Sequence, residues 1–148
     1  MALINVVLVD DEPRSLKVLQ LLASAYADQI RVVAACTDPQ LAIQKINELS
    51  PDLIIMDIQM PKLTAFDVLA ALHNPKVEVI FATAYNAYAM RAFQYSAVDY
   101  LLKPIDEEQF KRAIEKAIER IMQKNSNQHF ETLLHNILAS QVNFDSAR

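Results

Sequence analysis

Short apolar segments alternate with helical patterns along most of the chain, and this alternation restricts the fold more than any other feature. Five apolar runs have the length of a β-strand and are rich in Val, Ile and Leu, namely Ile4–Val9, Ile30–Ala35, Leu53–Met56, Val77–Ala82 and Val98–Leu102. Most of them are apolar at consecutive rather than alternate positions, as expected for strands buried on both faces. The pattern predicts a parallel sheet with helices above and below it.

The segments between these runs carry signals for helix starts. Pro13 suits a first helical turn, where its missing N–H is not needed, and Asp38–Pro39 repeats this signal. Helical spacing predicts helices over about 64–73 and 86–95, and the capping box Asp106–Gln109 opens a fifth, strongly amphipathic helix. Because crossover connections are right-handed, we predict an α/β fold with a doubly wound five-stranded sheet of flavodoxin-like order 2-1-3-4-5.

The sequence after the fifth helix differs in character. Residues 124–127 are polar and interrupt the apolar stripe, and a second amphipathic pattern follows over 130–140. We therefore assign residues 1–123 to one domain and 124–148 to a helical linker or tail. The apolar stripe of the tail either packs on the domain or on a missing neighbour, or it forms a dimerisation or signalling helix, and the sequence favours neither.

Charge and cysteine content argue against several classes of function. The net charge of −4 gives no positive field that would attract DNA or anionic lipid. The single cysteine, Cys36, cannot form an intramolecular disulfide, and no cluster of Cys and His suggests a metal site. No apolar run approaches the roughly 20 residues needed to cross a bilayer, and no secretion signal is recognisable. These features predict a cytoplasmic protein without membrane contact.

Polar side chains follow four of the predicted strands at the point where each strand ends. They are Asp10 and Asp11 after the first strand, Asp57 after the third, Thr83 after the fourth and Lys103 after the fifth. Each could by itself be a helix cap or a turn residue. In open parallel sheets, however, ligands bind beyond the carboxyl ends of the strands. The coincidence of these residues at one edge therefore favours a common site.

The chemistry of this set indicates phosphoryl transfer. Carboxylates that share one hollow repel by roughly 4 kcal/mol per pair at about 4 Å in an effective dielectric of about 20. A magnesium ion, which prefers hard oxygen ligands, would relieve this repulsion. An aspartate can act as nucleophile toward a phosphoryl group. Lys103 and Thr83 would supply a cation and a hydrogen bond to the phosphoryl oxygens.

Four short motifs resemble the signature set of two-component response regulator receiver domains. They are Val9–Glu12, Met56–Pro61, Ala82–Ala84 and Tyr100–Pro104, and the resemblance extends over about residues 3–123. The stretch 83–105 is similar to receivers of the LytTR class, which carry a C-terminal DNA-binding domain. Residues 124–148 are too few for such a domain. Either the sequence is part of a longer regulator or the chain acts alone, and DNA is expected to be contacted only through an output domain outside this sequence.

The resemblance assigns the acidic residues to phosphoryl and metal binding. Asp57 would be the phosphoacceptor for a sensor histidine kinase. Mg²⁺ would be held by Asp57, by Asp11 directly, by Asp10 through a water and by the main-chain carbonyl of Gln59. The expected chemistry is at most self-catalysed phosphotransfer and autodephosphorylation, so the chain is not expected to be an enzyme.

The resemblance also implies a conformational switch. Thr83 and Tyr100 would be the switch pair, Lys103 would bind the phosphoryl group, and the peptide bond before Pro104 would be cis. Phosphorylation would reshape the face made by helix 4, strand 5 and helix 5. A homodimer could form through this face or through the C-terminal helix. The candidate contacts are Tyr88, Phe93, Tyr95 and the outer side of helix 5, although for Phe93 we favour a place in the core.

One departure from the family pattern concerns glycine. The chain contains none, against an average usage of about 7%. Receivers usually carry a glycine in the loop after the Met-Pro pair, where this chain has Ala65. A Cβ at that position is expected to strain or reshape the loop.

Two other functions are compatible with part of the sequence. Phosphatases of the haloacid dehalogenase type also use an aspartate nucleophile and magnesium, but they need a second aspartate two positions later as general acid. Gln59 stands there and cannot donate that proton. A receiver fold used only for docking is the other alternative, which the intact set of motif residues disfavours.

Overall fold

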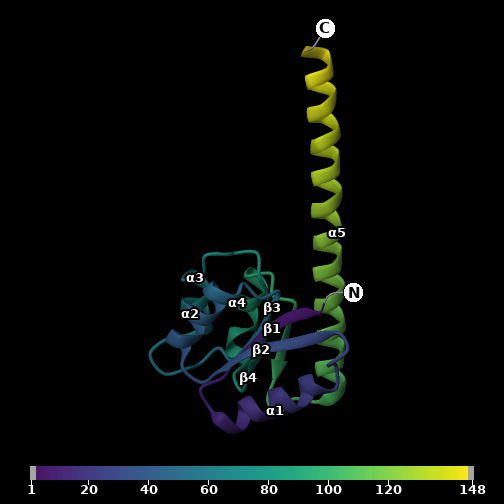
Figure 1. Ribbon diagram of the computed structural model, residues 1–148. Helices are drawn as coiled ribbons and strands as arrows, with labels where there is room; N and C mark the ends of the chain where they lie inside the picture. Colours follow the sequence, from purple (N-terminus) through teal and green to yellow (C-terminus); the bar gives the residue numbers. More distant parts are fainter. Residues whose placement is uncertain (1–2, 147–148) are drawn as a thin grey trace. The chain divides into compact units, whose positions relative to one another are not determined.

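The computed structural model describes the backbone of residues 3–146 and the side chains of residues 3–139. Five parallel strands form one sheet of order β2-β1-β3-β4-β5 (Figure 1), which confirms the predicted topology. The strands are β1 (Ile4–Val9), β2 (Ile30–Cys36), β3 (Leu53–Met56), β4 (Glu78–Thr83) and β5 (Asp99–Leu102). All four residues of β3 are buried, in keeping with the continuous apolar runs of the sequence.

The helices agree with the sequence prediction in order and differ from it in extent. They are α1 (Pro13–Ser24), α2 (Pro39–Leu49), α3 (Ala65–Ala70), the 3-10 turn η1 (Asn86–Tyr88), α4 (Ala89–Gln94) and α5 (Glu107–Ser146). The helix expected over 64–73 is shorter, and the one expected over 86–95 divides into η1 and α4. The polar stretch 124–127 interrupts the apolar stripe without ending α5, because none of its residues is Pro or Gly.

The chain separates into two compact units, one ending at Ala117 and the other beginning at Ile118. The boundary lies inside α5, a few residues before the one that we expected from the sequence. In the part of the chain that the structure describes, no helix, α5 included, combines the length and the apolar character required to cross a bilayer.

Helices cover both faces of the sheet, which gives the first unit two apolar layers (Figure 1). On one face, residues of α2, α3 and α4 pack against β1, β3 and β4. Phe66 of α3 lies 5.4 Å from Phe81 of β4 between ring centroids on this face. On the other face, Tyr26, which follows α1, lies 6.0 Å from Phe110 in the first turn of α5. Both faces of the sheet are thereby covered by packed side chains beneath its carboxyl edge.

The register of the strands aligns their carboxyl ends. Val9 of β1 pairs with Met56 of β3, and Met56 pairs with Phe81 of β4. Thr83 at the end of β4 pairs with Leu102 at the end of β5. The residues that follow these strands therefore meet along one edge of the sheet, which is where the candidate site forms.

Within the described backbone, three non-glycine residues take the left-handed conformation that glycine usually supplies. Ser50 has φ 45°, Lys62 has φ 73° and Ser96 has φ 56°. Ala65 is not among them, because it begins α3 and its buried side chain joins the core. The backbone strain of the β3–α3 loop therefore lies at Lys62 and not at Ala65.

We expect Lys62→Gly to stabilise the protein by about 0.5–1 kcal/mol in urea denaturation. A left-handed residue with a Cβ costs roughly 1–2 kcal/mol, part of which is offset by the greater freedom of glycine in the unfolded chain. Ala65→Gly is the matched control, and it should destabilise by about 1 kcal/mol because the position is helical. Equal effects of the two substitutions would contradict this location of the strain.

Candidate functional site

Backbone hydrogen bonds extend the sheet one residue beyond three of its strands and thereby place the site residues. The N–H of Asp10 donates to the carbonyl of the last residue of β2 at 3.0 Å, and the N–H of Asp57 donates to that of Val9 at 3.0 Å. The N–H of Lys103 donates to the carbonyl of Thr83 at 2.9 Å. Each of these side chains is therefore carried by the sheet itself and not by a free loop.

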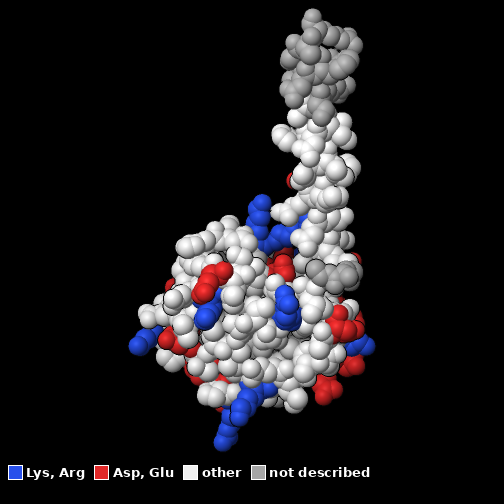
Figure 2. Space-filling model, in the orientation of Figure 1, with Lys and Arg blue, Asp and Glu red and all other residues white. Residues whose placement is uncertain are grey.

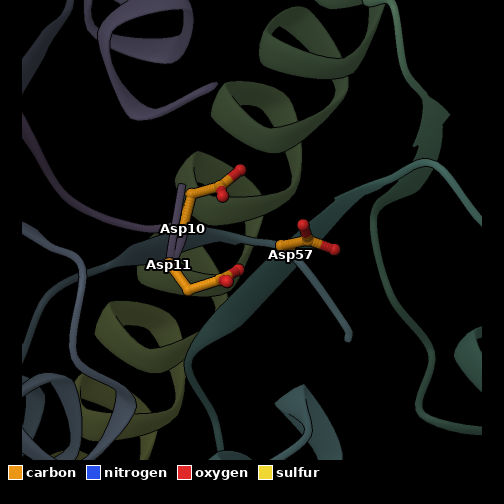
Figure 3. A group of neighbouring side chains, drawn as sticks. All are labelled: Asp10, Asp11 and Asp57. Carbon is orange, nitrogen blue, oxygen red and sulfur yellow. The ribbon is translucent and has the colours of Figure 1, made fainter. Parts of the chain in front are cut away.

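Three carboxylates gather at this edge. Asp10, Asp11 and Asp57 each place one carboxylate oxygen within 4.8 Å of the others. Figure 3 shows Asp10 and Asp11 extending from neighbouring positions after β1, with Asp57 beside them. Asp10 is fully buried and Asp57 is 7% exposed. The structure thus brings together the acids that the sequence predicted to share one hollow.

Lys103 is the counter-ion of this cluster. Its Nζ lies 2.7 Å from Asp10 Oδ2 and 2.8 Å from Asp57 Oδ2. Burial lowers the pKa of Lys103, but hydrogen bonds to Asp10 and Asp57 outweigh it, so its pKa is raised above the ordinary value. Burial raises the pKa of Asp10 despite its hydrogen bonds to Lys103 and to the N–H of Glu12. The site therefore holds charges that burial alone would disfavour.

One oxygen of Asp57 is left without a partner. Asp57 Oδ2 is paired with Lys103, whereas Oδ1 is buried and has no hydrogen-bond partner among the described residues. Buried polar atoms are rarely left in this state. A ligand that supplies positive charge or electrophilic character would satisfy this oxygen, and the oxygens of Asp10 and Asp11 nearby suit a hard cation. The residues present therefore fit a magnesium ion.

The other predicted site residues surround the cluster on β4 and β5. Thr83 is fully buried, and its Oγ1 accepts a hydrogen bond from the N–H of Tyr85 at 3.4 Å. The hydroxyl of Tyr100 donates to the carbonyl oxygen of Tyr85. The Lys103–Pro104 peptide bond is cis. Thr83 and Tyr100 thus both contact Tyr85, although they lie on different strands.

Gln59 lies two residues after Asp57 and is fixed at both its backbone and its side chain. It forms an isolated antiparallel bridge with Thr64. Its Oε1 accepts a hydrogen bond from the hydroxyl of Tyr88 at 2.5 Å. This contact was not predicted, because 29 residues separate the partners and neither the periodicity nor the motifs relate them.

An aromatic cluster holds the two ends of α4 against α3. Phe66 lies 6.2 Å from Tyr88 and 5.1 Å from Tyr95 between ring centroids, and Cζ of Arg91 lies 4.2 Å above its ring. Phe93 does not join this cluster. Its side chain is 80% exposed, so its assignment to the core was wrong, because the helical face that packs inward is that of Ala92.

Comparisons with known proteins show which family this chain is similar to. A family model described as a response regulator receiver domain matches residues 6–115. The transcriptional regulatory protein BtsR of Salmonella typhi is 36% identical over 137 residues, which are 90% of this chain and 54% of the relative. BtsR of Escherichia coli K12 shows the same identity and coverage. The chain spans about half the length of these curated relatives.

Solved structures are similar to the fold. The response regulatory domain of protein mrkE from Klebsiella pneumoniae superimposes with a TM-score of 0.74 at 26% identity, covering 80% of this chain and 98% of that one. The REC domain of AraT, a response regulator from Geobacillus stearothermophilus, also gives a TM-score of 0.74, at 24% identity, over 84% of this chain and 99% of that one. The latter likeness supports the fold alone.

Proposed function

Because the chain belongs to the response regulator receiver domain family, we propose that it is a phosphoacceptor switch of a two-component system. Asp57 takes a phosphoryl group from a sensor histidine kinase. The observation that carries this proposal is the state of the Asp57 carboxylate, which has one oxygen 2.8 Å from Lys103 Nζ and the other buried without a partner. Such an acid is positioned to react and is already compensated by a cation.

In the proposed transfer, a carboxylate oxygen of Asp57 forms a bond to phosphorus while the bond between phosphorus and the donor breaks. The electron pair of the broken bond leaves with the donor. Lys103 neutralises the phosphoryl charge, and the hydroxyl of Thr83 donates a hydrogen bond to a phosphoryl oxygen. Positioning and charge neutralisation supply most of the catalysis in such transfers.

Magnesium is the proposed cofactor. Asp11 and Asp57 would hold it directly, Asp10 through a water and Gln59 through its main-chain carbonyl. A bound magnesium ion would neutralise charge that develops on the phosphoryl oxygens. The unpartnered Asp57 Oδ1 and the neighbouring carboxylates support this assignment.

The proposed chemistry ends with a phosphorylated switch and not with catalytic turnover of a substrate. The receiver family is not a family of catalytic enzymes. In addition, Gln59 occupies the position where a phosphatase of the haloacid dehalogenase type needs an acid, and an amide cannot protonate a leaving group.

Incubation with acetyl phosphate and magnesium tests the proposal directly. Intact mass measurement should show the addition of one phosphoryl group. A protein that remains unmodified over a range of donor concentrations would contradict the proposed function.

Phosphorylation is proposed to act on the face made by α4, β5 and α5. Thr83 moves toward the phosphoryl group and Tyr100 turns inward behind it. Tyr100 suits this role because its ring is apolar and its hydroxyl polar, and that hydroxyl now donates to the carbonyl oxygen of Tyr85. On this face, Lys116 of α5 pairs with Asp99 of β5 at 3.3 Å beside a groove of about 310 Å³.

Beryllofluoride, which mimics a bound phosphoryl group, should shift the protein from monomer to dimer in light scattering. Phe93→Asp should weaken the dimer at least about tenfold, because a charge on an apolar contact costs more than about 1.4 kcal/mol. The side chain is exposed, so folding should be unaffected. Leu134→Asp is the matched variant in the tail. Loss of the dimer in Leu134→Asp alone would place the interface on the C-terminal helix, and the absence of any dimer would contradict this route.

The wider role is that of the regulatory part of a LytTR-type transcriptional regulator in the cytoplasm. Residues 1–123 would be the receiver and 124–148 a helical linker or tail. The relatives named as transcriptional regulatory proteins are about twice as long as the matching part. On the face shown in Figure 2, Lys and Arg are interspersed with Asp and Glu and do not gather in one basic patch. The net charge of −4 gives no positive field for DNA, so we propose that DNA is contacted by the output domain.

A further inference from the structure

The Tyr88–Gln59 hydrogen bond connects the start of α4 with the loop that carries the acid site. Gln59 follows Asp57 by two positions, and the residues on either side of it, Ile58 and Met60, are buried in the core. This alternation turns the Gln59 side chain away from the core. It is exposed at the carboxyl edge of the sheet, where the hydroxyl of Tyr88 reaches its Oε1 at 2.5 Å.

The ring of Tyr88 is held from two sides. It lies 6.2 Å from the ring of Phe66 and 6.4 Å from that of Tyr85, with an edge-on arrangement in the second pair. Phe66 is itself buried and packs on Phe81. The Tyr88 hydroxyl therefore has little freedom to leave Gln59, and the hydrogen bond fixes which end of the amide faces α4.

The orientation of the amide matters for the stability of a phosphorylated Asp57. In hydrolysis of the acyl phosphate, the oxygen of a water bonds to phosphorus and the bond from phosphorus to the Asp57 oxygen breaks. The electron pair of that bond returns to the carboxylate, the water loses a proton to solvent, and inorganic phosphate leaves. An amide oxygen that accepts a hydrogen bond from the water orients it for attack, as a glutamine does in GTP-hydrolysing proteins.

The Tyr88 hydroxyl competes with such a water for the side-chain oxygen of Gln59. A glutamine side chain accepts only through its oxygen and donates only through its nitrogen. With one lone pair of Oε1 occupied by the Tyr88 hydroxyl, the group of the amide that remains without a partner among the described residues is its donor, Nε2. Nε2 can donate a hydrogen bond to a phosphoryl oxygen, but it cannot accept a hydrogen bond from an attacking water.

We propose that Tyr88 is a positioning residue that prolongs the phosphorylated state by holding the side-chain oxygen of Gln59. This inference rests on the proposed phosphorylation of Asp57. Because Tyr88 ends η1 and directly precedes α4, it makes the lifetime of the phosphoryl group sensitive to the position of the helix through which the switch is proposed to signal.

The test uses the full chain in four forms: wild type, Tyr88→Phe, Gln59→Ala and the double variant. Each is loaded with acetyl phosphate and magnesium, the donor is removed by rapid desalting, and the loss of the phosphoryl group is followed by intact mass. Tyr88→Phe should shorten the lifetime about fivefold, the factor that one neutral hydrogen bond can supply. In the Gln59→Ala background the same substitution should change the lifetime less than about twofold.

Tyr95→Phe is the matched control. Tyr95 packs on the same Phe66 ring at 5.1 Å, so this variant removes a hydroxyl from the same cluster without touching Gln59. Its lifetime should equal that of the wild type. An unchanged or longer lifetime in Tyr88→Phe, or an equal effect of that substitution with and without Gln59, would overturn the inference. Failure of the wild type to load would instead contradict the proposed function itself.

Discussion

Asp57→Asn is expected to acquire no phosphoryl group from acetyl phosphate and magnesium, whereas the wild type acquires one. The amide is nearly the same shape as the carboxylate, but its oxygen is a far weaker nucleophile and carries no charge for a cation or for Lys103. We expect modification to fall more than about 100-fold, below detection by intact mass. Asp10 and Asp11 should not accept the phosphoryl group in place of Asp57, because both would hold the metal.

Asp28→Asn is the matched control for this experiment. Asp28 is an exposed carboxylate in the turn after α1, remote in the sequence from every site residue, and its variant should be modified like the wild type. Peptide mapping of the modified wild type should locate the group on the peptide that contains Asp57. A phosphoryl group on the Asp57→Asn protein would contradict the assignment of the acceptor.

Lys103→Met is expected to destabilise the metal-free protein by about 3 kcal/mol and to slow phosphorylation about 100-fold. Removal of one partner from a buried ion pair costs about 3–5 kcal/mol. Because the Lys103 side chain is 18% exposed, we expect the loss of stability to lie at the low end of this range. Two carboxylates, Asp10 and Asp57, would lose their cation together. Urea denaturation with and without magnesium measures the effect, and magnesium should recover part of the loss.

The pKa shifts of Lys103 and Asp10 determine in which direction substitution of each residue should change the stability of the metal-free protein. The raised pKa of Lys103 contributes stability that is present below its unfolded value of 10.5 and is lost as pH rises through the folded pKa. The pKa of Asp10 is raised mainly by burial, so at neutral pH its ionisation costs stability. Asp10→Asn should therefore raise the urea midpoint of the metal-free protein at pH 7. Changes of the same sign in Asp10→Asn and Lys103→Met would contradict this description of the site.

The strand order and the edge that carries the site could be predicted from local patterns. Continuous apolar runs require burial on both faces, and such strands must be parallel and covered by helices. Once that topology is given, the handedness of the crossovers aligns the carboxyl ends. Asp10, Asp57 and Lys103 follow those ends in the sequence, so their meeting was already implied by the alternation of apolar segments.

Helix ends and the positions of strained residues were less accessible to sequence reasoning. The absence of glycine indicated that some residue must adopt a positive φ, but the family pattern directed attention to Ala65 and not to Lys62. The short α4 exposes Phe93, although its apolar side chain suggested burial. In each case the conformation or exposure of the residue depends on how the whole loop or helix packs and not on the residue considered alone.

The sequence by itself determined which residue types stand at the ends of the strands, because that depends only on local periodicity. The tertiary structure alone decided which atoms of these residues pair with one another. Lys103 bridges Asp10 and Asp57, and Tyr88 captures the Gln59 oxygen. Such contacts join positions 29 to 93 residues apart, and they depend on differences of about an ångström in how helices settle on the sheet.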